Sequence, residues 1–217
     1  MLNNFTNILW DFDGVIMDSN PIRDVGFEQI FASFPKEQVD ALMVFHRNNG
    51  GLSRFVKIRY FFEEILHKQV SEATVQEYAD SFSTLMRELL LNKSLLIADS
   101  LHFIQQEAGN RQFHLVSASA QDELHYVSKA LDIDSYFISI VGSPASKTDN
   151  VQQLLQQYGY HAGNTCLIGD SHNDAHAAAA NHIPFFGYHS AKLEADERLG
   201  YVYSFREGKY REGRSEL

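Results

Sequence analysis

The chain has 217 residues, 44% of them hydrophobic and 21% charged, and a formal net charge of −10 at pH 7. This length suits one large domain or one domain with a small second one, and the composition is that of a soluble globular protein. The acidic balance argues against general nucleic-acid binding, which favours basic surfaces.

The start of the chain and its single cysteine bear on the compartment. Residues 1–4 lack the basic start of a signal peptide, and no apolar run approaches the roughly 20 residues that span a membrane. Cys166 excludes an internal disulfide and lies in an apolar run, which predicts a buried thiol in a reducing compartment. We therefore expect a cytoplasmic protein without a membrane partner.

The first predicted strand, residues 5–10, ends directly before two carboxylates, Asp11 and Asp13, and before Gly14. Residues two apart on a strand share a face, and ligands bind at the carboxyl ends of strands in an open α/β sheet. Two neighbouring acids repel each other unless a cation or a shared proton relieves the repulsion. The pair therefore predicts a metal-assisted reaction in which one carboxylate is a candidate attacking group.

About a hundred residues separate the first strand from the second, many more than one crossover helix needs. We expect a small all-helical cap domain there, residues 17–93, inserted after the first strand and resting above its carboxyl end. The core then comprises residues 1–16 and 94–217. Hydrophobic spacing predicts helices at 22–34, 36–47, 53–66 and 72–91, followed by 100–108 in the core.

Beyond the cap, apolar runs alternate with helical patterns. This alternation indicates an α/β fold, a Rossmann-like parallel sheet flanked by helices and built from right-handed crossovers. The tail, residues 206–217, is rich in Glu, Arg and Gly, and we expect it to be loosely ordered. Strands are predicted at 113–116, 137–141, 166–168 and 183–186, with helices at 122–131, 150–158 and 173–181.

Polar residues also follow the second and third strands. Ser117 and Ala118 offer a hydroxyl and backbone N–H groups that suit phosphate oxygens, although Ser119 or Ala120 equally suits the start of a helix. Lys147 opens a predicted helix against the helix dipole, which favours acids there. That position indicates a role in balancing carboxylate and phosphate charge.

The fourth strand is followed by Asp170 and Asp174, which share one face if a helix starts there. Helix capping explains acids at this position as well. Mg²⁺ commonly pairs with one or two carboxylates plus substrate phosphate, and the spacing of a calcium loop is absent. We therefore expect the strand ends to form one Mg²⁺ site.

In this order the motifs resemble those of the haloacid dehalogenase-like superfamily. The resemblance covers nearly the whole chain and is greatest to the phosphatase and β-phosphoglucomutase branch, in which a helical cap follows the first motif. It implies an enzyme that transfers a phosphoryl group. The matching residues are Asp11-Phe12-Asp13-Gly14, Ser117, Lys147 and Gly169-Asp170-Ser171 with Asp174.

The resemblance also implies a role for each residue. Asp11 would accept the phosphoryl group as an aspartyl-phosphate, while Asp13 would act as general acid and then as base toward water. Ser117 and the Ala118 N–H would hold the phosphate, and Lys147 would steady its charge. The dehalogenases lack an acid at the position of Asp13, which argues against dehalogenation. Mg²⁺ would be bound by Asp11, the backbone carbonyl of Asp13, Asp170 and, directly or through water, Asp174.

Substrate recognition is expected in the cap. Residues 41–62 contain four bases and no Asp or Glu, which indicates a surface that faces an anion. Gly51, Ser53 and Arg54 match the cap loop through which β-phosphoglucomutases contact the sugar phosphate, and Lys57 is a further candidate. The plain alternative is a helix-turn-helix whose bases are solvated.

The leading hypothesis is a Mg²⁺-dependent phosphatase that hydrolyses a small phosphate monoester, such as a sugar phosphate. One alternative is a phosphosugar mutase of the β-phosphoglucomutase type, although Gly50 stands where the mutase loop has a lysine. Another is a catalytically silent binding protein, against which the intact acids argue. Phosphonate-cleaving relatives use an imine-forming cap lysine, but nothing in the sequence marks Lys57 as desolvated.

The expected partner is a small phosphorylated metabolite, and the expected state is a monomer or weak dimer.

Overall fold

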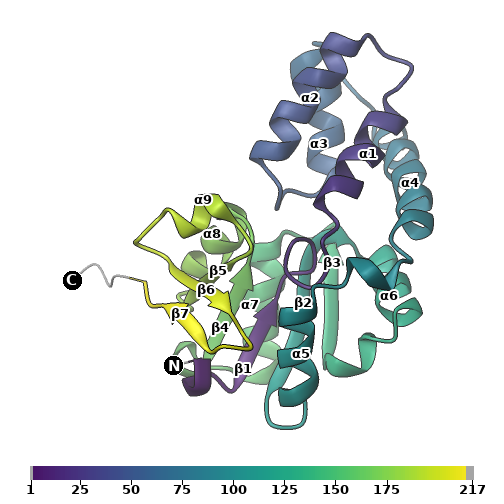
Figure 1. Ribbon diagram of the computed structural model, residues 1–217. Coiled ribbons are helices and arrows are strands. Elements are labelled where there is room, and N and C mark those ends of the chain that lie inside the picture. The colour runs from purple at the N-terminus through teal and green to yellow at the C-terminus, as the bar shows by residue number, and fades with distance from the viewer. Residues whose placement is uncertain (1, 214–217) are drawn as a thin grey trace.

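The computed structural model describes residues 2–213, in which a twisted sheet with helices on both faces lies below a separate group of helices (Figure 1). The strands are β1 (Asn7–Trp10), β2 (Gln112–Ala120), β3 (Ser139–Ser143), β4 (Thr165–Gly169), β5 (Phe185–Tyr188), β6 (Gly200–Ser204) and β7 (Lys209–Arg211). They lie in the order β3-β2-β1-β4-β5-β6-β7, and every neighbouring pair is parallel except β6 and β7. The predicted α/β, Rossmann-like sheet is therefore confirmed.

Helices α1 to α8 fall where hydrophobic spacing predicts them, with ends shifted by a few residues, whereas α9 was not predicted. Five of them, α1 to α5, lie between β1 and β2, as expected, and the last of the five, α5, packs on the sheet. Their bounds are α1 (Asn20–Ile30), α2 (Lys36–Asn48), α3 (Arg54–Tyr60, continued by a π-helical turn over Phe61–Ile65), α4 (Glu72–Leu89), α5 (Ala98–Glu107), α6 (Gln121–Ala130), α7 (Lys147–Tyr158), α8 (His172–Ala180) and α9 (Ala191–Glu194).

Alternation along β1 gives the sheet a hydrophobic core on each face. Ile8 and Trp10 belong to the cluster that includes residues of α5 and α6, whereas Leu9 belongs to the cluster formed with α7 and α8. Cys166 on β4 is fully buried, as predicted. In the described part of the chain, no helix has both the length and the apolar character that crossing a membrane takes.

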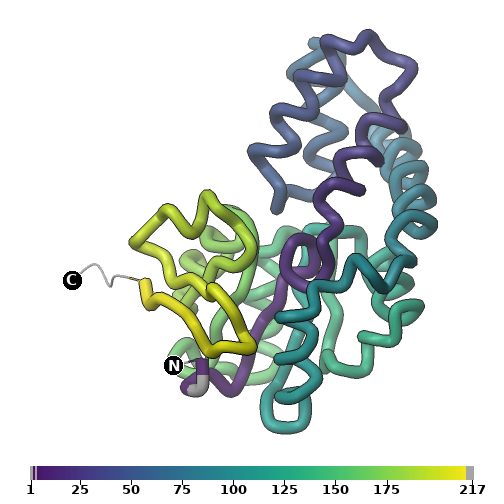
Figure 2. Tube along the Cα trace, in the orientation of Figure 1, coloured from purple at the N-terminus to yellow at the C-terminus, as the bar shows by residue number. Residues whose placement is uncertain are grey.

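The chain passes between the sheet and helices α1–α4 through two segments that run side by side (Figure 2). The N–H of Asp18 donates to the carbonyl of Leu95 at 2.8 Å, and the N–H of Ile97 donates to that of Ile16 at 2.9 Å. The boundaries expected between core and cap fall at these paired segments. The division into two domains stays a prediction.

The prediction for the end of the chain is wrong in part. Lys209–Arg211 form β7, which pairs antiparallel with β6, and neither strand was anticipated. The Asp99 carboxylate on α5 accepts hydrogen bonds from the N–H groups of Phe205 and Arg206, at 2.8 and 3.0 Å, and so fixes the connection between them. No local sequence signal marks this long-range contact. Residues 214–217 lie outside the described residues.

Aromatic side chains pack between helices α1–α4, in continuity with the core above one face of the sheet, and Phe31 contacts several of them. This side chain is fully buried, stacks on Tyr78 at a centroid distance of 4.9 Å and lies 4.2 Å from the ring of Phe61. Phe31→Ala leaves a cavity among these rings, so we expect the free energy of unfolding in urea to fall by about 3–5 kcal/mol. Val44→Ala, at a site 62% exposed on α2, is the matched control and is expected to change it by less than about 0.5 kcal/mol. Equal losses in the two variants would contradict this assignment of the core.

Candidate active site

The carboxyl ends of β1 to β4 bring the predicted site residues together. Asp11 follows β1, Ser117 lies near the end of β2, Lys147 begins α7 beyond β3, and Asp170 follows β4. Because β1 lies between β2 and β4, the strand order reverses at this point, and such a reversal opens a crevice for ligands in α/β sheets.

Lys147 lies between two carboxylates. Its Nζ is 2.7 Å from Oδ1 of Asp11 and forms a second ion pair with Oδ1 of Asp174. Burial alone would lower the pKa of this ammonium, but the two carboxylates more than offset burial and raise the pKa above its usual range. The lysine at the helix start is therefore a buried positive charge.

Asp11, Asp170 and Asp174 form a cluster that fits a divalent cation. One oxygen of each lies within 4.8 Å of the others. Burial and the neighbouring Asp174 raise the pKa of Asp11 well above its usual range and that of Asp170 to about 7, although Asn20 donates a hydrogen bond to Asp170 at 2.8 Å. Mg²⁺ and Ca²⁺ prefer hard oxygen ligands such as carboxylates, and a cation here would balance the clustered negative charge.

Asp174 also has the structural role that its position at a helix start suggested. Ser171 is the N-cap of α8, and its N–H and hydroxyl donate to Oδ2 of Asp174 at 3.0 and 2.7 Å. The other oxygen of Asp174 pairs with Lys147. The capping box thus holds this carboxylate in place within the site.

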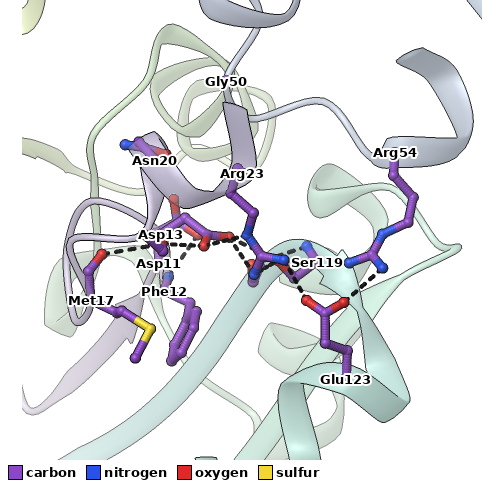
Figure 3. A network of polar contacts seen from close by, with 12 residues as sticks. Asp11, Phe12, Asp13, Met17, Asn20, Arg23, Gly50, Arg54, Ser119 and Glu123 are labelled. Atoms are coloured by element: carbon purple, nitrogen blue, oxygen red, sulfur yellow. Dashed lines mark hydrogen bonds and ion pairs between the residues drawn. The ribbon is translucent and has the colours of Figure 1, made fainter. Parts of the chain in front are cut away.

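Asp13 has a cationic partner that sequence reasoning missed. Nε of Arg23, on α1, donates to Oδ1 of Asp13 at 2.9 Å, Ser119 donates to Oδ2 at 2.8 Å, and Ser19 donates a further short bond (Figure 3). Burial raises the pKa of Asp13, but Arg23 and the two hydroxyls outweigh burial and hold the pKa below its usual value. Asp13 is therefore a carboxylate in this arrangement.

The same arginine begins a chain of buried ion pairs between helices α1–α4 and helix α6, which packs on the sheet (Figure 3). Arg23 also binds Oε1 of Glu123 on α6, and Oε2 of Glu123 lies 2.7 Å from Nη1 of Arg54 on α3. The side chain of Glu123 is 1% exposed, and the two arginines hold its pKa low against the effect of burial. Arg54 donates in addition to Ser83 at 2.6 Å. No spacing in the sequence pointed to Glu123.

Ser117 and Ala118 were expected to follow the second strand, but they lie within the last part of β2, which continues to Ala120. The Ser117 hydroxyl is buried and accepts the N–H of Ser119 at 3.0 Å. Ala120 is the residue before α6, so the helix-start alternative holds for Ala120 and not for Ser119. Ala118 lines a small cavity.

A cavity of about 40 Å³ separates the sheet edge from helices α1–α4. Of the four residues predicted for substrate binding in the cap, Arg54 and Lys57 line it, whereas Gly51 and Ser53 do not. Gly51 instead packs on the core, since a Cβ there would meet Ser171 Oγ at 2.5 Å, and Ser53 precedes α3 as its N-cap residue. The residues that line the cavity are Asp13, Asn20, Arg23, Phe27, His46, Gly50, Leu52, Arg54, Lys57, Phe82, Ala118 and Ser119.

Residues 8–188 match the family model described as haloacid dehalogenase-like hydrolase. Pyrophosphatase PpaX of Oceanobacillus iheyensis is 23% identical over 172 residues, which cover 77% of this chain and 75% of that protein. The β-phosphoglucomutase of Clostridium difficile superposes with a TM-score of 0.74 at 16% identity, over 94% of this chain and 93% of its own. CbbY of Rhodobacter sphaeroides, solved with phosphate, superposes with a TM-score of 0.71 at 14% identity, over 94% and 96%.

The position of Gly14, just after Asp13, requires glycine for two reasons: its backbone conformation and its close approach to Asp170. Its φ is +74°, and a Cβ there would lie 2.1 Å from Oδ2 of Asp170. We expect Gly14→Ala to lower the free energy of unfolding by at least about 1 kcal/mol, through the left-handed backbone alone, and to displace Asp170. Urea unfolding checks this, with Gly163→Ala as the control, since a Cβ at Gly163 meets nothing within 4 Å. The same loss in both variants would contradict the close approach at Gly14.

Proposed function

The chain belongs to the haloacid dehalogenase-like hydrolase family, and from that premise we propose that it is a Mg²⁺-dependent phosphatase of a small phosphate monoester. The family and the phosphatase and mutase neighbours support an enzyme that acts on phosphate esters. The observation that carries the finer proposal is Asp11, a buried carboxylate beside Lys147 and the oxygen cluster. A sugar phosphate is one substrate of the proposed class.

In the proposed reaction Asp11 is the nucleophile. Lys147 and the Phe12 N–H hold its Oδ1, at 2.7 and 2.8 Å, which orients the carboxylate toward the crevice. One carboxylate oxygen attacks phosphorus, the bond from phosphorus to the ester oxygen breaks, and an aspartyl-phosphate forms. Water then attacks the same phosphorus, which releases phosphate and restores Asp11. Ser117 and the Ala118 N–H hold the phosphate oxygens, and Lys147 offsets their charge.

Asp13 is the proposed proton carrier for both steps. It gives a proton to the departing ester oxygen and then takes one from the attacking water. Paired with Arg23, it is an ionised carboxylate and fits the second of these tasks. For the first, it needs a proton and a loosened contact with Arg23.

The carboxylate cluster supports a bound Mg²⁺. Asp11, the backbone carbonyl of Asp13 and Asp170 would hold the ion, with Asp174 assisting, and the ion would neutralise charge on the transferring phosphoryl group. The raised pKa values of Asp11 and Asp170 support this proposal, because Lys147 alone does not offset the burial and mutual repulsion of these acids.

A phosphosugar mutase is the alternative within the same chemistry. Release of phosphate by water from a panel of phosphorylated metabolites, without a bisphosphate activator, supports the phosphatase. Inorganic pyrophosphate belongs in the panel because a relative is a pyrophosphatase. Turnover only with a bisphosphate would support the mutase, and no turnover of any compound would support a silent binding protein.

Substitution of the two motif carboxylates separates their roles. Asp11→Asn is expected to abolish phosphate release, because no nucleophile remains. Asp13→Asn is expected to lower kcat by about 10²–10⁴-fold and to let the phosphoenzyme accumulate, since water is no longer deprotonated. Phosphate release and intact-protein mass spectrometry measure these effects. Asp40→Asn, on exposed α2, is the control. Full activity in Asp11→Asn would refute the proposed nucleophile.

Metal binding is expected to be linked to pH. The pKa of Asp170 is raised to about 7, so the ion-free protein binds this proton more tightly when folded and loses that stability as pH rises through 7. Mg²⁺ binds the ionised carboxylates and competes with the proton. We therefore expect Mg²⁺ to raise Tm more at pH 8 than at pH 6, and to raise it little in Asp170→Asn. A larger shift at pH 6 would contradict this linkage.

A further inference from the structure

Among the described residues, Lys57 is a buried cation of the cavity that has no carboxylate partner. It is 3% exposed, and its Nζ donates to the carbonyl of Gly50 at 3.1 Å and lies 5.6 Å from the ring centroid of Phe27. Burial lowers its pKa to about 7. The desolvation of this ammonium, which the sequence did not reveal, is only partly offset by the more distant carboxylates of Asp13, Asp24 and Asp170, and none of the described carboxylates forms an ion pair with it.

The other cations of the cavity are already neutralised. Arg23 pairs with Asp13 and Glu123, and Arg54 pairs with Glu123 (Figure 3). The nearby Asp24 is held by Arg47, at 2.6 Å, and by His46, at 3.0 Å.

The charges around the cavity therefore do not balance. Three cations, Arg23, Arg54 and Lys57, face two carboxylates, Asp13 and Glu123. His46 adds no charge at neutral pH, since burial lowers its pKa to about 3. When Lys57 is protonated, the excess is one positive charge, and it lies at Lys57.

The free space beside Lys57 suits a small anionic group. It amounts to about 40 Å³, room for roughly three water molecules, and a carboxylate is a group of that order of size. Asp13, Ala118 and Ser119 line the same cavity from the sheet, so a ligand that reaches Lys57 is continuous with the place where phosphate is expected.

We propose that Lys57 binds a carboxylate of the substrate and thereby selects short phosphorylated hydroxy acids, whereas Arg54 holds the helices α1–α4 on the core through Glu123. This inference rests on the proposed phosphatase function. The resemblance implied contact with the sugar phosphate through Gly51, Ser53 and Arg54, with Lys57 as a further candidate. The present proposal keeps Lys57 and gives Arg54 a structural role instead.

Two matched pairs of compounds test the proposal, each differing by a carboxylate against a hydroxymethyl group. They are 2-phosphoglycolate against 2-hydroxyethyl phosphate, and 3-phosphoglycerate against glycerol 3-phosphate. The measurement is the ratio of kcat/KM within each pair. A buried charge-assisted hydrogen bond predicts a preference for the carboxylate of about 10- to 100-fold in at least one pair.

Variants assign that preference to one residue. Lys57→Met is expected to reduce the ratio to near one, and Lys57→Arg to restore part of it. Lys68→Met, at an exposed lysine between α3 and α4, is expected to leave the ratio as it is. The double variant Arg54→Gln with Glu123→Gln removes both charges of that ion pair together and is expected to keep the preference.

Each outcome has a separate meaning. Hydrolysis of p-nitrophenyl phosphate with no carboxylate preference in either pair overturns the role of Lys57 and leaves the phosphatase intact. Loss of the preference in the double variant but not in Lys57→Met assigns it to Arg54 and also overturns the proposal. Absence of turnover on every ester, p-nitrophenyl phosphate included, refutes the proposed function itself.

Discussion

Repulsion among carboxylates gathered at one edge of the sheet is the constraint on which the rest of the site depends. Asp11, Asp13, Asp170 and Asp174 are brought there by parallel strands that end together, and a cluster of buried acids needs positive charge. Lys147 supplies it between Asp11 and Asp174, at a helix start where a lysine is otherwise unfavourable. One lysine does not offset all the negative charge of this cluster. The remaining negative charge, at Asp11 and Asp170, makes this position suited to a divalent cation.

The cation for Asp13 comes from a different part of the chain. Arg23 lies on α1, so the position of the helices above the sheet determines whether Asp13 is paired, and Glu123 connects the same arginine to Arg54 on α3. Buried ion pairs of this kind add little net stability, because desolvation offsets most of their attraction. Their effect is on geometry: they define one closed arrangement in which the charge of a motif residue is set by the helices that cover it.

Most of the fold and the core of the site were predictable, because both depend on local pattern and on parallel topology. The strands predicted from apolar runs were confirmed. Parallel topology alone brings the motif residues at their ends together, so no distant contact had to be known to predict the cluster. Arg23 and Glu123 are a hundred positions apart and occupy ordinary helix sites, so only packing brings them together. The desolvation of Lys57 likewise depends on packing against Phe27, and β7 depends on β6 and Asp99.

The paired segments between the sheet and helices α1–α4 have a consequence for how such chains can be rebuilt. The hydrogen bonds of Asp18 with Leu95 and of Ile97 with Ile16 hold the two ends of a long excursion next to each other. The two ends of the inserted segment are therefore held together at the sheet whatever lies between them. The entropic cost of closing such a loop grows only slowly with the length of the segment. We therefore expect helices of another size or sequence to be accepted between these two ends, because the distance between the ends stays the same.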